Sequence, residues 1–161
     1  VVLPEPVPPQ IPIIIVFGFW FLVFGYCYVI ELSFRLNLNK HSKTEKDFAA
    51  LLEQDKEVTK WLRPAQNQFR IYWKNNSKQY HPDFVAETND SIYLVETKKQ
   101  DDIATTDVQD KAKAALEFCK NATDYTVANS GKPWRYVLIP HNAVQLNMSF
   151  ATLVKQFEQT R

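Results

Sequence analysis

The chain has 161 residues, of which 45% are hydrophobic, and its formal net charge is +1. This length leaves room for one folded domain with a sizeable core, and the near-neutral balance excludes a uniformly basic nucleic-acid binder. The charge is nevertheless uneven: residues 40–80 carry nine Lys or Arg against five Asp or Glu, and residues 81–110 carry two against eight. This pattern fits a phosphate-contacting flank beside a metal-binding carboxylate cluster, or else ordinary solvated faces.

Residues 1–36 form a Pro-rich and hydrophobic segment that precedes the domain. Residues 1–12 hold five prolines and predict an extended linker. Residues 11–30 contain no charged residue, and a helix of that length crosses a hydrocarbon core of about 30 Å. If this stretch spans a membrane, which is not the favoured interpretation, the basic residues that follow it would place the rest of the chain in the cytoplasm by the positive-inside rule. The alternatives are a buried pair of hydrophobic strands broken at Gly18 and Gly25, or a segment foreign to the domain.

The predicted domain comprises residues 37–161. Its first half begins with a predicted helix. Ser42 and Glu45 form a capping box, and hydrophobic residues then follow at largely helical spacing: Phe48, Leu51, Leu52, Val58 and Leu62. Residues 69–73 predict a short strand, and Asn75-Asn76-Ser77 predicts the turn that follows it.

A β-hairpin is expected over residues 81–99. Phe84 to Ala86 and Ile92 to Val95 favour strands, and the residues between them are typical of a turn because Asn89 and Asp90 tolerate left-handed backbone. A loop centred on these two residues sets Asp83 opposite Glu96.

Two facing carboxylates destabilise a sheet unless positive charge lies between them. Strand alternation puts Lys98 on the same face as Glu96, beside this pair. Hard oxygen ligands in this number suit Mg²⁺ or Mn²⁺, which keep several waters and bind substrate phosphate.

The second half of the domain is predicted as helix, strand and helix. Thr106 and Gln109 resemble a second capping box, which opens a helix with one stripe of small and apolar residues: Val108, Ala112, Ala115, Cys119 and Ala122. Residues 134–139 predict the last strand and residues 150–157 an amphipathic helix. The expected class is α/β with the order α-β-β-β-α-β-α.

Pro82-Asp83 followed by Glu96-Thr97-Lys98 resembles the signature of the PD-(D/E)xK nuclease superfamily. Over residues 42–157 the chain is similar to the C-terminal nuclease region of type III restriction enzyme Res subunits. The similarity is carried by Trp61-Leu62-Arg63-Pro64, Tyr80 to Phe84, Tyr93 to Lys98, Val108-Gln109-x-Lys111-Ala112-x-Ala114-Ala115 and Gly131-Lys132-Pro133-Trp134-Arg135-Tyr136-Val137-Leu138-Ile139-Pro140-His141.

This resemblance implies a restriction-endonuclease-like core, with a mixed central sheet flanked by helices, and a Mg²⁺-dependent endonuclease that cuts double-stranded DNA and leaves 5′-phosphate ends. Asp83, Glu96 and the backbone carbonyl of Thr97 would bind metal, and Lys98 would orient the attacking water. Glu45 is a further metal candidate whose capping role already explains it. The expected DNA contacts are Gln109, Lys111, Lys74 and Lys78.

The resemblance also implies two partners, a modification subunit that reads the recognition site and an ATP-dependent motor region. The chain itself has no nucleotide-binding motif, serine-hydrolase elbow or zinc-ligand spacing. Cys27 and Cys119 are expected to be free thiols in a reducing compartment. Two alternatives stay open: a catalytically silent domain that contacts DNA through Lys74, Lys78 and Arg70, and an interaction domain anchored in the membrane by residues 11–30.

Overall fold

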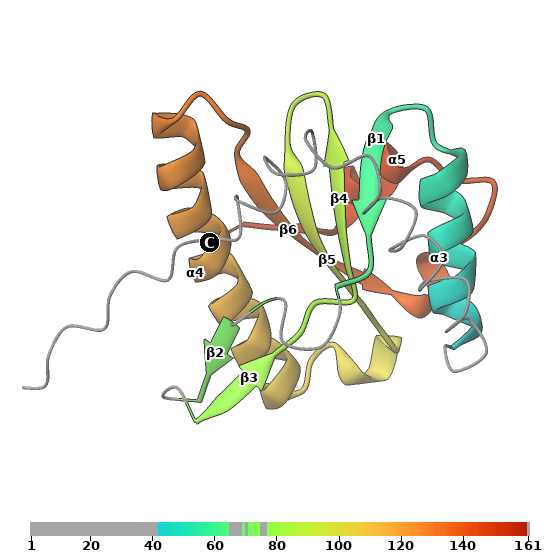
Figure 1. The fold of residues 1–161 in the computed structure, drawn as a ribbon. Coiled ribbons are helices and arrows are strands. Elements are labelled where there is room, and N and C mark those ends of the chain that lie inside the picture. The colour runs from blue at the N-terminus through green and yellow to red at the C-terminus, as the bar shows by residue number, and fades with distance from the viewer. Residues whose placement is uncertain (1–41, 65–68, 70, 75–76, 161) are drawn as a thin grey trace, which may run out of the picture.

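A five-stranded mixed sheet, with helices on both faces, organises the part of the chain that the computed structural model describes, residues 42–64, 69, 71–74 and 77–160 (Figure 1). In chain order its elements are α3 (Lys43–Gln54), β1 (Val58–Leu62), β2 (Ile71–Trp73), β3 (Lys78–Tyr80), β4 (Phe84–Thr88), β5 (Ile92–Lys98), the 3₁₀ helix η2 (Gln100–Asp102), α4 (Thr106–Ala128), β6 (Trp134–Pro140), the 3₁₀ helix η3 (His141–Ala143), α5 (Phe150–Phe157) and β7 (Glu158–Gln159). The predicted α/β class is confirmed.

The strand order in the sheet is β1-β4-β5-β6-β7, in which only the β5–β6 pair is parallel. The β4–β5 hairpin pairs Phe84 with Val95, so the predicted register is confirmed. The turn closes with the Thr88 N–H donating to the Ser91 carbonyl at 2.9 Å. Neither residue of the loop has a positive φ, so the tolerance of Asn89 and Asp90 for left-handed backbone is not used.

Helix α3 is shorter than predicted. The expected helix ran on to Leu62, but it ends at Gln54, and residues 58–62 instead form β1, antiparallel to β4. Asp55 ends the helix in an extended conformation, with its carboxylate accepting from the N–H groups of Glu57 at 2.9 Å and Phe150 at 2.6 Å. Apolar residues at Val58 and Leu62 satisfy helical spacing and an edge strand alike, and pairing with β4 decides between them.

The segment between β1 and β4 also differs from the prediction. The expected strand over residues 69–73 is reduced to β2, which pairs with β3 in a separate two-stranded sheet. One expected central strand is therefore part of an accessory hairpin, whose other strand, β3, was not predicted, and β1 takes its place in the central sheet. The strand that was predicted to be the last, now β6, is followed by one more, because β7 pairs with β6 at the edge of the sheet.

Helix α4 covers the predicted residues, but its predicted capping box is wrong. The N-cap is Thr105, one residue earlier, and its side chain makes no capping hydrogen bond. The Gln109 side chain reaches out of the helix and donates from Nε2 to the Ile103 carbonyl at 2.8 Å. The predicted apolar stripe of α4 is buried.

Two cores lie on the two faces of the sheet. One face is covered by α4 and the β2–β3 hairpin, and the other by α3 and α5 (Figure 1). Along β5, Ile92 and Leu94 belong to the first core and Val95 to the second, as strand alternation requires. Glu96 therefore lies on the α4 side of the sheet.

Several expectations concern residues outside the described ranges, namely the segment 1–36 with its candidate span, Cys27 and Arg70. In the described ranges, none of the helices combines the length and the apolar character that crossing a membrane requires. Cys119 is a free, buried thiol, as predicted, and burial raises its pKa far above the ordinary value.

Phe48→Ala should lower the free energy of unfolding by about 3–5 kcal/mol, because a fully buried aromatic ring is replaced by a cavity. The Phe48 ring is 0% exposed and packs edge-on against Phe84 and Phe150, with centroids 5.1 and 6.2 Å away. Urea denaturation followed by circular dichroism measures the change. Tyr125→Ala is the control, because Tyr125 is 47% exposed, and it should stay within about 0.5 kcal/mol. Equal losses in the two variants would contradict the packing of α3.

Candidate functional site

The central feature of the candidate site is the carboxylate of Glu96 near the end of β5. Glu96 is only 4% exposed, and its Oε1 forms an ion pair of 2.6 Å with Lys98 Nζ. Lys98 lies two residues after Glu96 in β5 and therefore on the same face of the strand, as predicted. The structure therefore brings two of the predicted site residues, Glu96 and Lys98, into direct contact.

Asp83 lies directly before β4, beside the same end of β5. Its Oδ2 accepts hydrogen bonds from the Thr97 N–H at 2.8 Å and from the Thr97 hydroxyl at 2.9 Å. These bonds hold the Asp83 carboxylate near Glu96, and its negative charge contributes to the raised pKa of Glu96. The charges of Asp83 and Glu96 thus interact, and Thr97 is the residue that positions the Asp83 carboxylate.

The electrostatics of the pair follow from burial. Burial, together with the charge of Asp83, raises the pKa of Glu96 to about 7, although Lys98 and Tyr80 act in the opposite direction. For Lys98, burial alone would lower the pKa, but the Glu96 carboxylate, with Asp83 and Glu45, raises it above the ordinary value. Lys98 is therefore a cation at neutral pH, suited to hold water or phosphate and not to take up a proton.

Sequence reasoning missed the role of Tyr80. Its hydroxyl donates to Glu96 Oε2 at 2.9 Å, and burial next to Glu96 raises the pKa of Tyr80, so the group stays a neutral donor. Tyr80 ends β3 and lies in the accessory hairpin, whose position over the sheet has no sequence signature. The available signal was its place three residues before Asp83, inside the run that carries the family resemblance.

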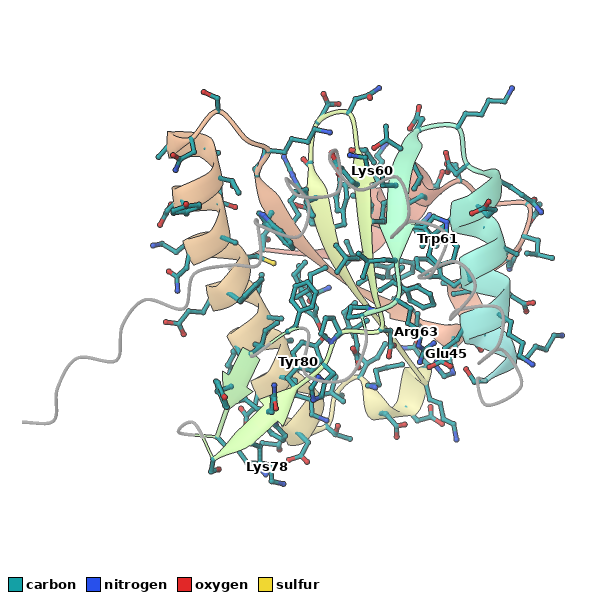
Figure 2. The ribbon with its side chains drawn as sticks, in the orientation of Figure 1. Glu45, Lys60, Trp61, Arg63, Lys78 and Tyr80 are labelled. Atoms are coloured by element: carbon teal, nitrogen blue, oxygen red, sulfur yellow. The ribbon has the colours of Figure 1, made fainter. Side chains whose placement is uncertain are left out.

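Glu45 lies in the first turn of α3. The predicted capping box is confirmed, with the Ser42 N–H donating to Glu45 Oε2 at 3.0 Å and the Glu45 N–H to Ser42 Oγ at 3.3 Å. Glu45 Oε1 also accepts from Arg63 Nη2 at 3.1 Å (Figure 2). Because its charge raises the pKa of Lys98, Glu45 lies within electrostatic range of the site.

Three of the four predicted DNA contacts gather around one aromatic ring, that of Trp73. The Nζ atoms of Lys74, Lys78 and Lys111 lie 5.0, 5.3 and 5.0 Å from the centroid of the Trp73 ring. The fourth, Gln109, is exposed on α4, with its amide bound to the Ile103 carbonyl. The structure thus groups the lysines and leaves Gln109 with a local backbone partner.

The donor set of the carboxylate pair is compatible with a hard divalent cation. Within the described ranges no group of three or more His, Cys, Asp or Glu side chains is arranged to hold a metal ion. Mg²⁺, however, commonly uses one or two carboxylates and completes its shell with water and substrate phosphate. Each oxygen of Glu96 accepts one contact, and each carboxylate oxygen has two lone pairs. A cation beside Asp83 and Glu96 would offset the like charge that raises the Glu96 pKa.

Comparison with protein-family models, with curated proteins and with solved structures finds no significant match to this chain. The described residues define a mixed α/β domain with two carboxylates and a paired lysine where β4 begins and β5 ends, at the end of the hairpin away from its turn.

The stability of the metal-free protein should fall as the pH rises from about 4.5 to about 7. Glu96 is protonated in both states below its ordinary pKa of 4.5, and in this window only the unfolded chain ionises, since the folded pKa is about 7. The expected loss is about 3 kcal/mol.

Urea denaturation in chelator at several pH values measures this loss. Glu96→Gln should flatten the decline, whereas Glu117→Gln, which alters an exposed residue of α4, should keep the wild-type slope. A Glu96→Gln variant with the wild-type slope would show that Glu96 is not the titrating group.

Proposed function

We propose that this chain contains a metal-dependent DNA endonuclease domain that hydrolyses phosphodiester bonds as part of a type III restriction system. The observation that carries the proposal is the contact of Glu96 with Lys98 beside Asp83, in the register expected of the PD-(D/E)xK signature. Two acids and a cation at one strand end are groups that metal-assisted hydrolysis uses, and a strongly shifted pKa such as that of Glu96 is typical of functional sites.

The topology supports a restriction-endonuclease-like core. Without the β2–β3 hairpin, the chain order is α3, β1, β4, β5, α4, β6, and the strands stand in this same order across the sheet. Two antiparallel pairs are followed by a parallel pair reached through α4. This is the helix, three-strand, helix, strand arrangement that the family resemblance implies, with the accessory hairpin as an insertion.

The backbone at Thr97 supports its role as a third oxygen ligand. The Thr97 N–H points toward Asp83, and in a strand the N–H and C=O of one residue point to the same side. Carried two residues beyond the paired strands, the β4–β5 register sets Pro82 opposite Thr97, and proline has no N–H to donate to that carbonyl. The proline of the signature therefore leaves the Thr97 oxygen without its ladder donor. Asp83, Glu96 and this oxygen would hold Mg²⁺ or Mn²⁺.

The chemistry assigned to the site is attack of water on a DNA phosphate. A bound divalent ion would polarise a phosphoryl oxygen and lower the pKa of the attacking water. The Lys98 ammonium holds that water or a phosphate oxygen and offsets the negative charge that grows as the new P–O bond forms. The attacking water loses a proton to solvent, the bond to the 3′ oxygen breaks, and that oxygen takes a proton from a solvent water, which leaves a 5′ phosphate and a 3′ hydroxyl. Tyr80, as donor to Glu96, keeps that carboxylate in place.

The remaining parts of the proposal follow from the family resemblance. Glu45 is a candidate for a further contact to the metal shell, in addition to its capping role. Double-stranded DNA is the substrate, with Gln109 and the three lysines around Trp73 as contacts. A modification subunit and an ATP-dependent motor region are the expected partners, and the cytoplasm is the expected compartment.

The second candidate function is a catalytically silent DNA-binding domain of the same fold. The gathering of Lys74, Lys78 and Lys111 around one ring favours it, because this cluster needs no metal to attract phosphate. The two candidate functions predict different effects of Mn²⁺, because only the nuclease should cut DNA when the metal is added. DNA binding without any Mn²⁺-dependent cleavage, with the motor and modification subunits supplied, would favour the silent domain.

Lys98→Ala should reduce plasmid cleavage about 100-fold or more, the usual effect of removing a group that stabilises transition-state charge. Mn²⁺ affinity should change little when calorimetry is done at about pH 8.5, where the wild-type Glu96 is ionised. Lys99→Ala is the matched control, because Lys99 follows the end of β5, is exposed and should keep most of the activity. Equal losses in both variants would overturn the site assignment.

Asp83→Asn and Asp83→Ala should both abolish cleavage but should differ in stability. Asn keeps an oxygen that accepts from the Thr97 N–H and hydroxyl, whereas Ala leaves the buried Thr97 N–H without its partner. The expected cost for Ala is about 1–3 kcal/mol relative to Asn, measured by urea denaturation in chelator. If the Asn variant cuts DNA like the wild type, Asp83 is structural.

A further inference from the structure

The accessory hairpin carries a compact cluster of positive charge. Lys74 follows β2, Lys78 begins β3 and Lys111 projects from α4, yet all three ammonium groups lie within 5.3 Å of the Trp73 ring centroid. No two of these nitrogens can be further apart than twice that distance, which is comparable with the Debye length of about 8 Å at physiological salt. The three cations therefore repel one another, and an anion placed among them would be stabilised.

One carboxylate already contacts this cluster, through Lys74. Asp107 Oδ1 forms an ion pair of 2.8 Å with Lys74 Nζ, and it lies four residues before Lys111 on the same face of α4. A hydrogen bond from Lys74, and the charges of Lys74, Lys78 and Lys111, lower the pKa of Asp107. Among the described residues, Asp107 is the only acid with an ion pair to this cluster. One negative charge thus faces three positive ones.

Two features indicate that the cluster is maintained at a cost to stability. The Trp73 Nε1 is buried without a hydrogen-bond partner in the described part of the chain, a cost of about 1–3 kcal/mol that phenylalanine would avoid. Tryptophan is, however, the side chain that attracts cations most strongly through its ring. Lys74 has a φ of 49°, in the left-handed region that favours glycine or asparagine, and such outliers cluster at binding sites.

The cluster lies close to the proposed catalytic carboxylates. Lys78 and Tyr80 are the first and last residues of β3 (Figure 2), about 7 Å apart along the strand. The Tyr80 hydroxyl donates to Glu96. A DNA strand whose reacting phosphate lies at Glu96 and Lys98 would pass the cluster within a few nucleotides, since phosphates repeat every ~3.4 Å of helix axis along each strand.

We propose that Lys74, Lys78 and Lys111 form a binding site for one backbone phosphate of duplex DNA, and that Asp107 acts as an internal substitute for this phosphate. When DNA binds, the phosphate displaces the Asp107 carboxylate from Lys74. This inference rests on the proposed function, because it takes the phosphate to belong to the DNA substrate of the nuclease domain. Asp107 thereby lowers the affinity for DNA and discourages other anions from occupying the cluster.

The test is duplex binding by the full chain, measured by fluorescence anisotropy in chelator at several salt concentrations. Asp107→Asn should raise affinity about twofold to fivefold, the range of an exposed ion pair that no longer competes. Lys78→Ala should lower affinity and reduce the slope of log K against log salt by about 0.9.

The chain offers a matched control for each variant. Asp124→Asn removes a carboxylate that pairs with Lys120 at 3.1 Å elsewhere on α4, and Lys113→Ala removes an exposed lysine of the same helix. Both controls change net charge by the same amount as the tested variants, and neither should match their effects. If Asp107→Asn gains no more than Asp124→Asn, or Lys78→Ala loses no more than Lys113→Ala, the inference is wrong. Tighter binding of duplex RNA than of duplex DNA would also overturn it.

The two proposals fail in different ways. A chain that binds DNA through these residues, but does not cut it in the presence of Mn²⁺ and its partners, contradicts the nuclease function and leaves the phosphate site standing. A chain that cuts DNA while all four variants bind alike contradicts only the phosphate site.

Discussion

The register of the β4–β5 hairpin is the constraint on which the candidate site depends. A strand places successive side chains on opposite faces, so a slip of one residue would move Glu96 from the α4 side to the α3 and α5 side. The same slip would separate Lys98 from its place beside Asp83. Two features fix the register. Leu94 and Val95 are buried in different cores, and the short turn at Asn89 and Asp90 does not allow one strand to shift along the other.

This register buries the Glu96 carboxyl group beside a second acid, Asp83, which makes ionisation of Glu96 unfavourable. Burial and the charge of Asp83 oppose ionisation of Glu96, while Lys98 and Tyr80 partly offset both effects. An added positive charge nearby, such as a bound cation, would therefore lower the pKa of Glu96 and favour its ionised form. This property distinguishes the pair from ordinary surface ion pairs such as Lys120 with Asp124, which contribute little to stability and respond weakly to their surroundings.

The accessory hairpin joins the two charged regions of the domain. Its β3 strand supplies Tyr80 to the carboxylates at one end and Lys78 to the Trp73 cluster at the other. Its β2 strand packs on α4, which supplies Lys111 and Asp107. The hairpin therefore links the lysine cluster around Trp73 to the buried Glu96 carboxylate.

The local parts of the site follow from the sequence alone. The capping box at Ser42 and Glu45, the β4–β5 register and the shared face of Glu96 and Lys98 depend on neighbours a few residues away, whose spacing is visible in the chain. The residues of α4 and α5 were likewise predictable, because their apolar stripes repeat with the helical period.

Tertiary structure decided what depends on distant partners. Val58 and Leu62 fit a helix or a strand, and only pairing with β4 selects the strand. Asp55, by binding the Phe150 N–H, links the end of α3 to the start of α5 across the chain. The contact of Tyr80 with Glu96 and the gathering of three lysines on Trp73 arise from where the hairpin packs on α4. Sequence spacing encodes local geometry, whereas these contacts exist only because distant segments share a core.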